Sequence, residues 1–198
     1  MTPTPRTRPV RSVAAQGRLR RRALETPIGP LLLVASDAGV RAVLWPGEDG
    51  ARVRLSLDAV ATGVAAEPPS AEGAAERRSP ADDHLDEAAA ELTEYFAGTR
   101  LEFDVTLDPV GTPFQQQAWQ ALRAIPYGRT ITYGEQAVVL GDPRKARAVG
   151  GANRGNPISV IVPCHRVVGR SGALTGFAGG LDTKAWLLAH EQRVLAAD

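Results

Sequence analysis

Residues 112–154 read TPFQQQAWQALRAIPYGRTITYGEQAVVLGDPRKARAVGGANR, and this stretch predicts three consecutive helices. The first begins with Thr112 as N-cap and Pro113 in the first turn, and keeps a helical spacing of apolar residues as far as Ile125. A second helix is predicted over about 134–140 and a third over about 144–153. Two short helices around a glycine-containing turn, the second of them cationic, are typical of a helix-turn-helix. Alone this pattern is weak, because most helical corners bind no nucleic acid.

The residues before this stretch begin with a hairpin pattern. Two aliphatic runs, 30–35 and 40–45, flank a short turn that contains Asp and Gly, which indicates a β-hairpin. Residues 46–80 are rich in Gly, Pro, Ala and Glu. We interpret them as a variable loop around one possible strand at 53–57.

A helix and a strand follow this loop. Apolar residues at i, i+3, i+4, i+7 and i+11 predict an amphipathic helix over 81–98. Asp82 or Asp83 is the expected cap at its start, and Gly98 suits its end. Apolar and polar residues then alternate, which predicts a short strand over 103–107.

Together these elements predict an α/β (α+β) chain in three parts. Residues 1–22, with arginines, prolines and no acid, are expected to form a flexible basic tail. Residues 23–108 are expected to form a small N-terminal α/β domain with a β-hairpin or sheet. Residues 109–198 are expected to form a mostly helical C-terminal domain that contains the helix-turn-helix.

The composition excludes several classes of protein. With 43% hydrophobic and 23% charged residues the chain is ordinary for a globular protein. No apolar run approaches the roughly 18 residues that a membrane span needs. The arginine-rich start is not followed by the apolar segment of a secretory signal, so we expect a cytoplasmic protein.

Charge is unevenly distributed along the chain. The formal net charge is only +1, yet residues 143–181 contain six cations and no acid. These cations are Arg144, Lys145, Arg147, Arg154, Arg166 and Arg170. Such a segment suits contact with phosphates, and an ordinary solvated basic face is the alternative.

The chain contains one cysteine, Cys164, which excludes an internal disulfide and any cysteine-rich zinc cluster. It is either an inert buried thiol or a nucleophile. A β-branched run at 158–162 predicts a buried strand directly before it. His165 and Arg166 follow the thiol, and an imidazole and a guanidinium favour thiolate. Neighbours on a strand point to opposite faces, so contact between thiol and imidazole needs a turn or a bridging water.

The segment 163–167, PCHRV, resembles the active-site signature of the O6-alkylguanine-DNA alkyltransferases, also called methylated-DNA–protein-cysteine methyltransferases. Further segments resemble the family in the same order along the chain: 111–115, 125–128, 132–135, 146–150, 156–157, 172–176 and 184–188 with Glu191. Residues 23–45 and 85–107 resemble its N-terminal domain less specifically. The resemblance implies a ribonuclease H-like N-terminal domain and a winged-helix-like C-terminal domain.

The resemblance also implies catalytic roles. Cys164 would accept the alkyl group, and His165 would take the thiol proton through a water. Glu191 would orient the imidazole and balance its charge. Asn156 would hold the turn that presents the thiol. Tyr133 would lie against the flipped nucleotide and donate a hydrogen bond as guanine leaves.

Other residues of the resemblance would bind DNA and the damaged base. Arg147 would fill the gap in the base stack. Further DNA contacts are expected from Arg144, Lys145, Arg154 and Arg166. The walls of the alkylguanine pocket would be Pro163, Val167, Phe177 and Ala178, with backbone groups of Cys164, Val167 and Ala178 at the guanine edge. Phe177 stands where many members have Tyr, which keeps an apolar wall.

Each of these residues has an ordinary alternative. Tyr133 could cap or pack a helix, and Arg147 could be one more phosphate contact. Asn156 could be half of a common Asn-Pro turn. Glu191 could be a surface residue of a helix, and we expect His190 on the surface.

The resemblance implies a monomer that binds double-stranded DNA carrying O6-alkylguanine and moves the alkyl group, also from O4-alkylthymine, onto Cys164 once. No cofactor is expected. No metal is expected either, because the zinc site of some members uses cysteines that this chain lacks. A non-catalytic lesion-binding module with a structural cysteine is one alternative. A Cys-His hydrolase is another, which the helix-turn-helix and the lack of an obvious oxyanion loop disfavour.

Overall fold

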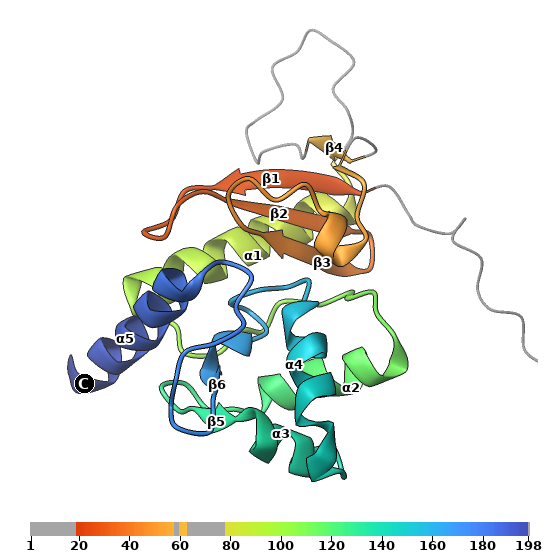
Figure 1. Ribbon diagram of the computed structural model, residues 1–198. Helices are drawn as coiled ribbons and strands as arrows, with labels where there is room; N and C mark the ends of the chain where they lie inside the picture. Colours follow the sequence, from red (N-terminus) through yellow and green to blue (C-terminus); the bar gives the residue numbers. More distant parts are fainter. Residues whose placement is uncertain (1–18, 58–59, 63–77, 198) are drawn as a thin grey trace, which may run out of the picture.

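The computed structural model describes residues 19–57, 60–62 and 78–197 (Figure 1). Its first part is a four-stranded sheet with the strand order β3-β2-β1-β4. The strands are Arg20–Leu24 (β1), Leu31–Ser36 (β2), Gly39–Leu44 (β3) and Ala61–Thr62 (β4). β2 pairs antiparallel with both β1 and β3, and β4 pairs parallel with β1. The predicted β-hairpin is therefore confirmed as β2 and β3.

Both faces of this sheet are buried, which explains why β2 is continuously apolar. Leu31, Leu33 and Ala35 face the main core of the molecule. Val34, between them, faces a second cluster on the other side of the sheet, together with Leu44 of β3. Successive residues of a strand point to opposite faces, so a strand buried on both sides needs no polar alternation.

The main helix of the N-terminal part is Pro80–Ala97 (α1), which covers one face of the sheet (Figure 1). The expected cap at Asp82 or Asp83 is wrong, because Ser79 is the N-cap and Asp82 is the third residue of the helix. The Asp82 carboxylate accepts hydrogen bonds from the backbone N–H and the hydroxyl of Ser79, at 2.8 and 2.9 Å. Gly98 ends the helix in a left-handed conformation, as predicted.

Two strands predicted in this part are wrong. The segment 53–57 follows a short 3-10 helix, Ala51–Val53 (η2), and packs its apolar side chains on the second cluster without joining the sheet. Arg54 there is left-handed, with φ of 58°, which interrupts an extended chain. The segment 103–107 makes only one bridge, between Leu107 and Val40. Gly39 of β3 packs directly against the backbone of this segment, so the segment approaches the sheet at this position.

The predicted tail is wrong for residues 20–22, which belong to β1 and pair with β2. The arginine side chains of this segment give no hydrophobic pattern that would predict a strand. The pairing with β2 is made by the backbone, which that pattern does not report. Residues 1–18 lie outside the described residues.

The C-terminal part contains the three predicted helices. They are Pro113–Arg123 (α2), Tyr133–Val139 (α3) and Ala146–Arg154 (α4), the last preceded by the 3-10 turn Pro143–Lys145 (η4). Thr112 caps α2 as predicted, and Thr132 caps α3 by accepting a hydrogen bond from Glu135 N–H at 3.1 Å. α2, α3 and α4 pack against one another. The helix-turn-helix is thus formed by α3 and α4.

A small sheet and a final helix complete the fold. Ile131–Thr132 (β5) and Val167–Val168 (β6) form a two-stranded parallel sheet. The final helix, Leu181–Ala197 (α5), lies against α1 (Figure 1), with the Trp186 ring 6.0 Å from the Phe96 ring. The main hydrophobic core includes residues from both parts. The α/β fold class is confirmed, and the domain boundary at 108 stays a prediction.

Candidate active site

The cysteine follows a buried turn, where the sequence predicted a strand. Ile158 makes one bridge to Val43 of β3, and the chain then reverses, so that Val162 N–H donates to the Ile158 carbonyl over 2.9 Å. Val160 is left-handed with φ of 71°, which is rare for a β-branched residue. The predicted strand at 158–162 is therefore wrong, although the run is buried as expected.

Asn156 supplies the hydrogen bonds that a neighbouring strand would otherwise make. Its side-chain amide donates to the Val162 carbonyl at 2.8 Å, and its side-chain oxygen accepts from Ile158 N–H at 3.1 Å. Asn156 itself is 1% exposed. The amide thus closes the turn that leads into Cys164.

Cys164 begins a 3-10 turn, Cys164–Arg166 (η5), and is buried. Burial raises the pKa of the thiol, and this effect is opposed by a hydrogen bond with Asn156 and by the charges of Lys184 and Arg52. Burial thus opposes the thiolate that the neighbouring imidazole and guanidinium were expected to favour. Its neighbours His165 and Arg166 direct their polar groups to Glu191 instead.

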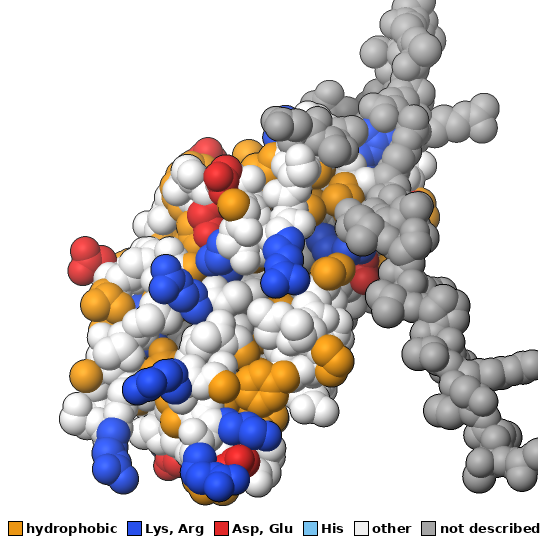
Figure 2. All heavy atoms as spheres, turned by 45° about the vertical axis from the view of Figure 1, so that its right-hand side comes forward, with side chains coloured by type: hydrophobic (Ala, Val, Ile, Leu, Met, Phe, Trp, Pro, Cys, Tyr) orange, Lys and Arg blue, Asp and Glu red, His pale blue; other side chains and the backbone are white. Residues whose placement is uncertain are grey.

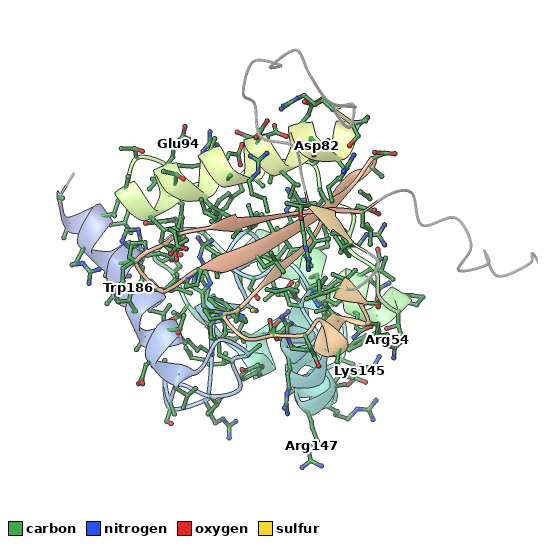
Figure 3. All side chains as sticks on the ribbon, turned by 90° about the horizontal axis from the view of Figure 1, so that it is seen from above. Arg54, Asp82, Glu94, Lys145, Arg147 and Trp186 are labelled. Carbon is green, nitrogen blue, oxygen red and sulfur yellow. The ribbon has the colours of Figure 1, made fainter. Side chains whose placement is uncertain are left out.

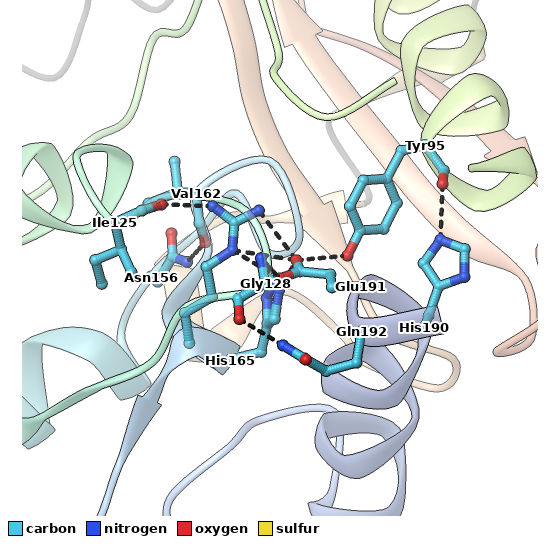
Figure 4. Close-up of polar contacts among 10 residues, drawn as sticks. Tyr95, Ile125, Gly128, Asn156, Val162, His165, His190, Glu191 and Gln192 are labelled. Carbon is cyan, nitrogen blue, oxygen red and sulfur yellow. Dashed lines mark hydrogen bonds and ion pairs between the residues drawn. The ribbon is translucent and has the colours of Figure 1, made fainter. Parts of the chain in front are cut away.

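His165 is fully buried and placed as a base. Its Nε2 lies 2.8 Å from Oε1 of Glu191 (Figure 4). A carboxylate only accepts, so Nε2 carries the proton and Nδ1 of the neutral ring has a free lone pair. Among the described residues Nδ1 has no hydrogen-bond partner. Burial lowers the pKa of His165, against the opposing effect of Glu191, so the ring is neutral and able to accept a proton at Nδ1.

Glu191 of α5 is the centre of this polar cluster and is fully buried. Oε2 accepts from Gly128 N–H at 2.8 Å, and both carboxylate oxygens accept from the Arg166 guanidinium at 3.0–3.1 Å. Burial would raise the pKa of Glu191, but the hydrogen bonds and charges of His165 and Arg166 lower it to about 2. The carboxylate is thus an anion at neutral pH, and the alternative of a surface residue is excluded.

Arg166 does not belong to the DNA surface, so that prediction is corrected. It is 5% exposed, and besides Glu191 its Nη1 donates to the Ile125 carbonyl at 2.7 Å. The guanidinium also lies 5.4 Å from the centre of the Tyr127 ring. Its charge neutralises a buried carboxylate, which is incompatible with reaching phosphates.

Tyr133 lies at the start of α3, beside the active-site loop 169–180. Its hydroxyl donates to the Thr175 carbonyl at 3.1 Å. The same carbonyl accepts from Lys184 Nζ at 2.9 Å, and this ammonium also donates to the Val167 carbonyl at 2.6 Å. Burial raises the pKa of Tyr133, against the opposing effect of its hydrogen bond to Thr175, so the phenol stays protonated and able to donate.

The predicted pocket residues divide between two cavities. Phe177 and Ala178 line a cavity of about 310 Å³. Pro163 instead lines a separate cavity of about 620 Å³ behind the cysteine turn, which Arg166 also borders. Phe177 connects the smaller cavity to His165, because it lies edge-on to that imidazole with 6.5 Å between ring centres. Val167 is fully buried in β6.

The cationic surface lies on the helix-turn-helix. Arg147, Arg154, Lys145 and Arg144 are all exposed, and Figure 2 shows Lys and Arg side chains predominating over the lower part of this face. Arg147 points away from the body of the protein (Figure 3). Arg144 is paired with Asp142 at 3.0 Å, which partly neutralises it. α4 passes beside the active site, because a Cβ on Gly150 would lie 3.8 Å from the Tyr133 ring.

Comparison with known proteins assigns the family. Residues 19–109 match the model of the 6-O-methylguanine DNA methyltransferase ribonuclease-like domain, and residues 113–193 match the corresponding DNA binding domain. A methylated-DNA–protein-cysteine methyltransferase of Methanosarcina acetivorans is 42% identical over 84% of this chain and 94% of its own length. The chain belongs to this methyltransferase family.

Other relatives agree with this assignment. A methylated-DNA–protein-cysteine methyltransferase of Salmonella typhimurium is 58% identical over 52% of this chain and 61% of its own length. The crystal structure of Mycobacterium tuberculosis O6-methylguanine methyltransferase has a TM-score of 0.72 at 39% identity, covering 91% of this chain and 96% of that one. A structure of the M. tuberculosis OGT protein in complex with DNA has the same TM-score and identity, covering 88% and 94%.

Sequence reasoning missed several residues at the site of this family member, among them Arg52, Trp45 and Lys184. Arg52 of η2 donates from Nη1 to the Asn156 carbonyl at 2.6 Å, and Trp45 at the end of β3 packs edge-on against Phe177 with 5.3 Å between ring centres. Both come from the N-terminal part, where no pattern signalled them. Lys184 had a signal, because with Leu187 and Glu191 it forms the i, i+3, i+7 buried face of α5.

His190 is also not where the sequence predicted it. It is 6% exposed, its Nε2 lies 2.8 Å from the Tyr95 carbonyl, and its ring stacks on Trp186 at 5.1 Å. The surface prediction is wrong because α5 is covered by α1 on that side. In the part of the chain that the structure describes, no three His, Cys, Asp or Glu residues are grouped to hold a metal ion. None of its helices is long and apolar enough to cross a membrane.

Proposed function

We propose that this protein repairs DNA by transferring the alkyl group of O6-alkylguanine onto Cys164, once per molecule. The observation that carries the proposal is the arrangement around the only cysteine of the chain. Cys164 follows a turn closed by Asn156, and the next residue is a buried neutral imidazole oriented by the Glu191 carboxylate. A thiol followed by an imidazole that a third group orients supports the assignment of a nucleophile and its general base.

In the reaction, the thiol proton passes through a water to Nδ1 of His165, and Glu191 stabilises the imidazolium that forms. The sulfur of Cys164 attacks the alkyl carbon as the bond between that carbon and O6 of guanine breaks. The bonding electrons stay on the guanine, which then takes up a proton. The thiol is neutral at rest because burial raises its pKa, so the proton transfer accompanies attack.

Tyr133 is the donor for the leaving guanine in this proposal. Its raised pKa keeps the hydroxyl protonated, and its present acceptor, the Thr175 carbonyl, also has Lys184 as a partner. The Tyr133 hydroxyl can therefore turn to the base without leaving that carbonyl unsatisfied.

DNA reaches the thiol by base flipping. Cys164 is 7% exposed, so a stacked base cannot touch it and the nucleotide must rotate out at a cost of a few kcal/mol. α4 enters the groove, and Arg147 fills the gap in the base stack. Arg154, Lys145 and, more weakly, Arg144 contact phosphates. Phe177 and Ala178 enclose the flipped base, with Pro163 and Val167 behind the thiol.

The thioether product has no good leaving group, so each molecule acts once. We extend the proposal to O4-alkylthymine, whose alkylated oxygen presents the same chemistry. We further propose that the protein acts as a monomer in the cytoplasm, without a cofactor or a metal.

The test is the mass of the protein after mixing with a duplex that contains one O6-methylguanine. Cys164 should gain the mass of one CH2, because methyl replaces the thiol hydrogen, and the gain should stop at one equivalent. Cys164→Ala should gain nothing and still bind the duplex in a gel shift. Binding without mass gain in the wild type would support the lesion-binding module instead, and repeated turnover of an ester would support the hydrolase.

A further inference from the structure

The N-terminal part contributes one side chain to the polar cluster around the Glu191 carboxylate, and this side chain is Tyr95 of α1. Tyr95 is fully buried, and its hydroxyl donates to Oε1 of Glu191 at 2.9 Å (Figure 4). These two residues lie 96 positions apart in the sequence. In the part of the chain that the structure describes, the other hydrogen bonds and ion pairs of the Glu191 carboxylate come from the C-terminal part.

The carboxylate of Glu191 is held from three directions. Gly128 fixes Oε2 from the loop after α2, and Arg166 grips both oxygens from η5. Tyr95 fixes Oε1, the same oxygen that bonds His165 Nε2, from the side of α1. A buried carboxylate with donors on every side cannot rotate, and the imidazole that it orients is fixed with it.

We propose that Tyr95 is a positioning residue for alkyl transfer: with Arg166 it holds the Glu191 carboxylate so that His165 keeps its proton on Nε2 and its Nδ1 free to accept the thiol proton. The proposal rests on the proposed function. It gives the N-terminal part of the chain a direct role in the chemistry, through one hydrogen bond.

The hydroxyl also adjusts the strength of the base. Each donor to Oε1 disperses part of the carboxylate charge, so less of it is available to stabilise a proton on His165. Without the Tyr95 hydroxyl, Glu191 attracts that proton more strongly, and the pKa of His165 rises from its lowered value.

Other charged and titratable groups lie near Tyr95, Glu191 and His165. Arg166 and Lys184 both lower the pKa of His165 through their positive charge. Tyr127 lies near the Tyr95 ring, at 5.9 Å, and His190 bonds the Tyr95 backbone carbonyl rather than its hydroxyl. A change confined to the Tyr95 hydroxyl therefore leaves these groups in place.

The experiment compares Tyr95→Phe with Tyr127→Phe. Both substitutions keep a ring and remove a buried hydroxyl, but the Tyr127 hydroxyl has no hydrogen-bond partner among the described residues. Single-turnover methyl transfer is measured against pH at saturating DNA. Tyr95→Phe should react roughly tenfold more slowly on the plateau, the usual weight of a hydrogen bond to a charged group. Its acid limb should move to higher pH, while Tyr127→Phe should stay within about twofold of wild type.

A second measurement separates positioning from mere folding. The chain has three histidines, so the imidazole signals of His165 can be assigned and titrated by NMR in both variants. A higher His165 pKa in Tyr95→Phe alone is expected. A wild type that transfers methyl normally, with both variants alike in rate and in His165 titration, would overturn only this inference. A wild type that transfers no methyl would overturn the proposed function, and this inference with it.

Discussion

Arg147 and Arg166 come from the same basic segment of the chain, yet they lie in opposite surroundings. Arg147 is exposed on α4 and points into solvent, whereas Arg166 is 5% exposed and grips the Glu191 carboxylate. An exposed guanidinium stays hydrated and can exchange its counterions for phosphates. A buried guanidinium paired with a carboxylate adds little net stability to the fold. Removing it, however, leaves an uncompensated anion in the core.

The difference shows that a run of cations can serve two unrelated purposes. Residues 143–181 contain both the exposed arginines of α4 and the buried guanidinium that helps to keep Glu191 ionised. We expect the exposed set to act on the affinity for DNA, and the buried one to act on stability and on proton transfer. The comparison is tested by substitutions that affect one property and spare the other.

The largest effect is expected inside the buried cluster, at His165. His165→Ala should slow methyl transfer by about 10²–10⁴-fold at pH 7, the usual range for losing a general base, with DNA affinity near wild type. Higher pH should partly rescue the variant, because solvent then deprotonates the thiol. Single-turnover rates against pH measure both effects. A wild-type rate at pH 7 would mean that another group, with Lys184 first among the charges near the thiol, activates Cys164.

Next comes stability, where the two arginines should differ most. Arg166→Ala should lower the free energy of unfolding by about 3–5 kcal/mol, because it leaves Glu191 buried without its main cation. Arg147→Ala, the matched control, should change it by no more than about 0.5 kcal/mol. Urea denaturation of the two variants measures the difference. Equal losses would contradict the assignment of Arg166 to the core.

As the pH falls, the buried cluster around Glu191 should lose its stabilising effect at a higher pH than the one at which α4 is affected. The pKa of Glu191 falls from 4.5 to about 2 on folding, so its carboxylate favours the folded state above pH 4.5. That stability is lost as the pH falls from 4.5 towards 2, by about 3 kcal/mol at roughly 1.4 kcal/mol per pKa unit. The lowered pKa of His165 adds a loss that begins below pH 6.5. Unfolding of wild type and Glu191→Gln at several pH values isolates the carboxylate, since the variant should lack its part of the slope.

The smallest effect is expected on the exposed side of the comparison. Arg147→Ala and Arg154→Ala should each lower DNA affinity and reduce the slope of log affinity against log salt by about one. Arg144→Ala should do less, because Asp142 already pairs with that guanidinium. At saturating DNA, Arg147→Ala should slow methyl transfer only to the extent that the Arg147 side chain assists base flipping. A salt slope unchanged in all three variants would place the DNA on another face.

Local patterns predicted the helices well because their signals are local. Caps, proline at the first turn and a 3.6-residue spacing lie within a few residues of each helix, and α1 to α4 begin and end near the expected positions. The strand at 158–162 failed for the same reason. An apolar run indicates burial, but whether it extends or turns depended on the Asn156 side chain.

By itself, the sequence determined the hairpin, the helices, the single thiol with its neighbouring imidazole, and the family. Only the tertiary structure decided which charged groups are buried together. The spacing of Lys184 and Glu191 on α5 indicates a buried face, but nothing near Arg166, Lys184, Tyr95 or Glu191 in the sequence identifies their partners, which lie 9 to 96 positions away in the chain. An ionised side chain is stable in the core only when the fold brings a compensating group within hydrogen-bond distance, and no pattern of neighbouring residues contains that information.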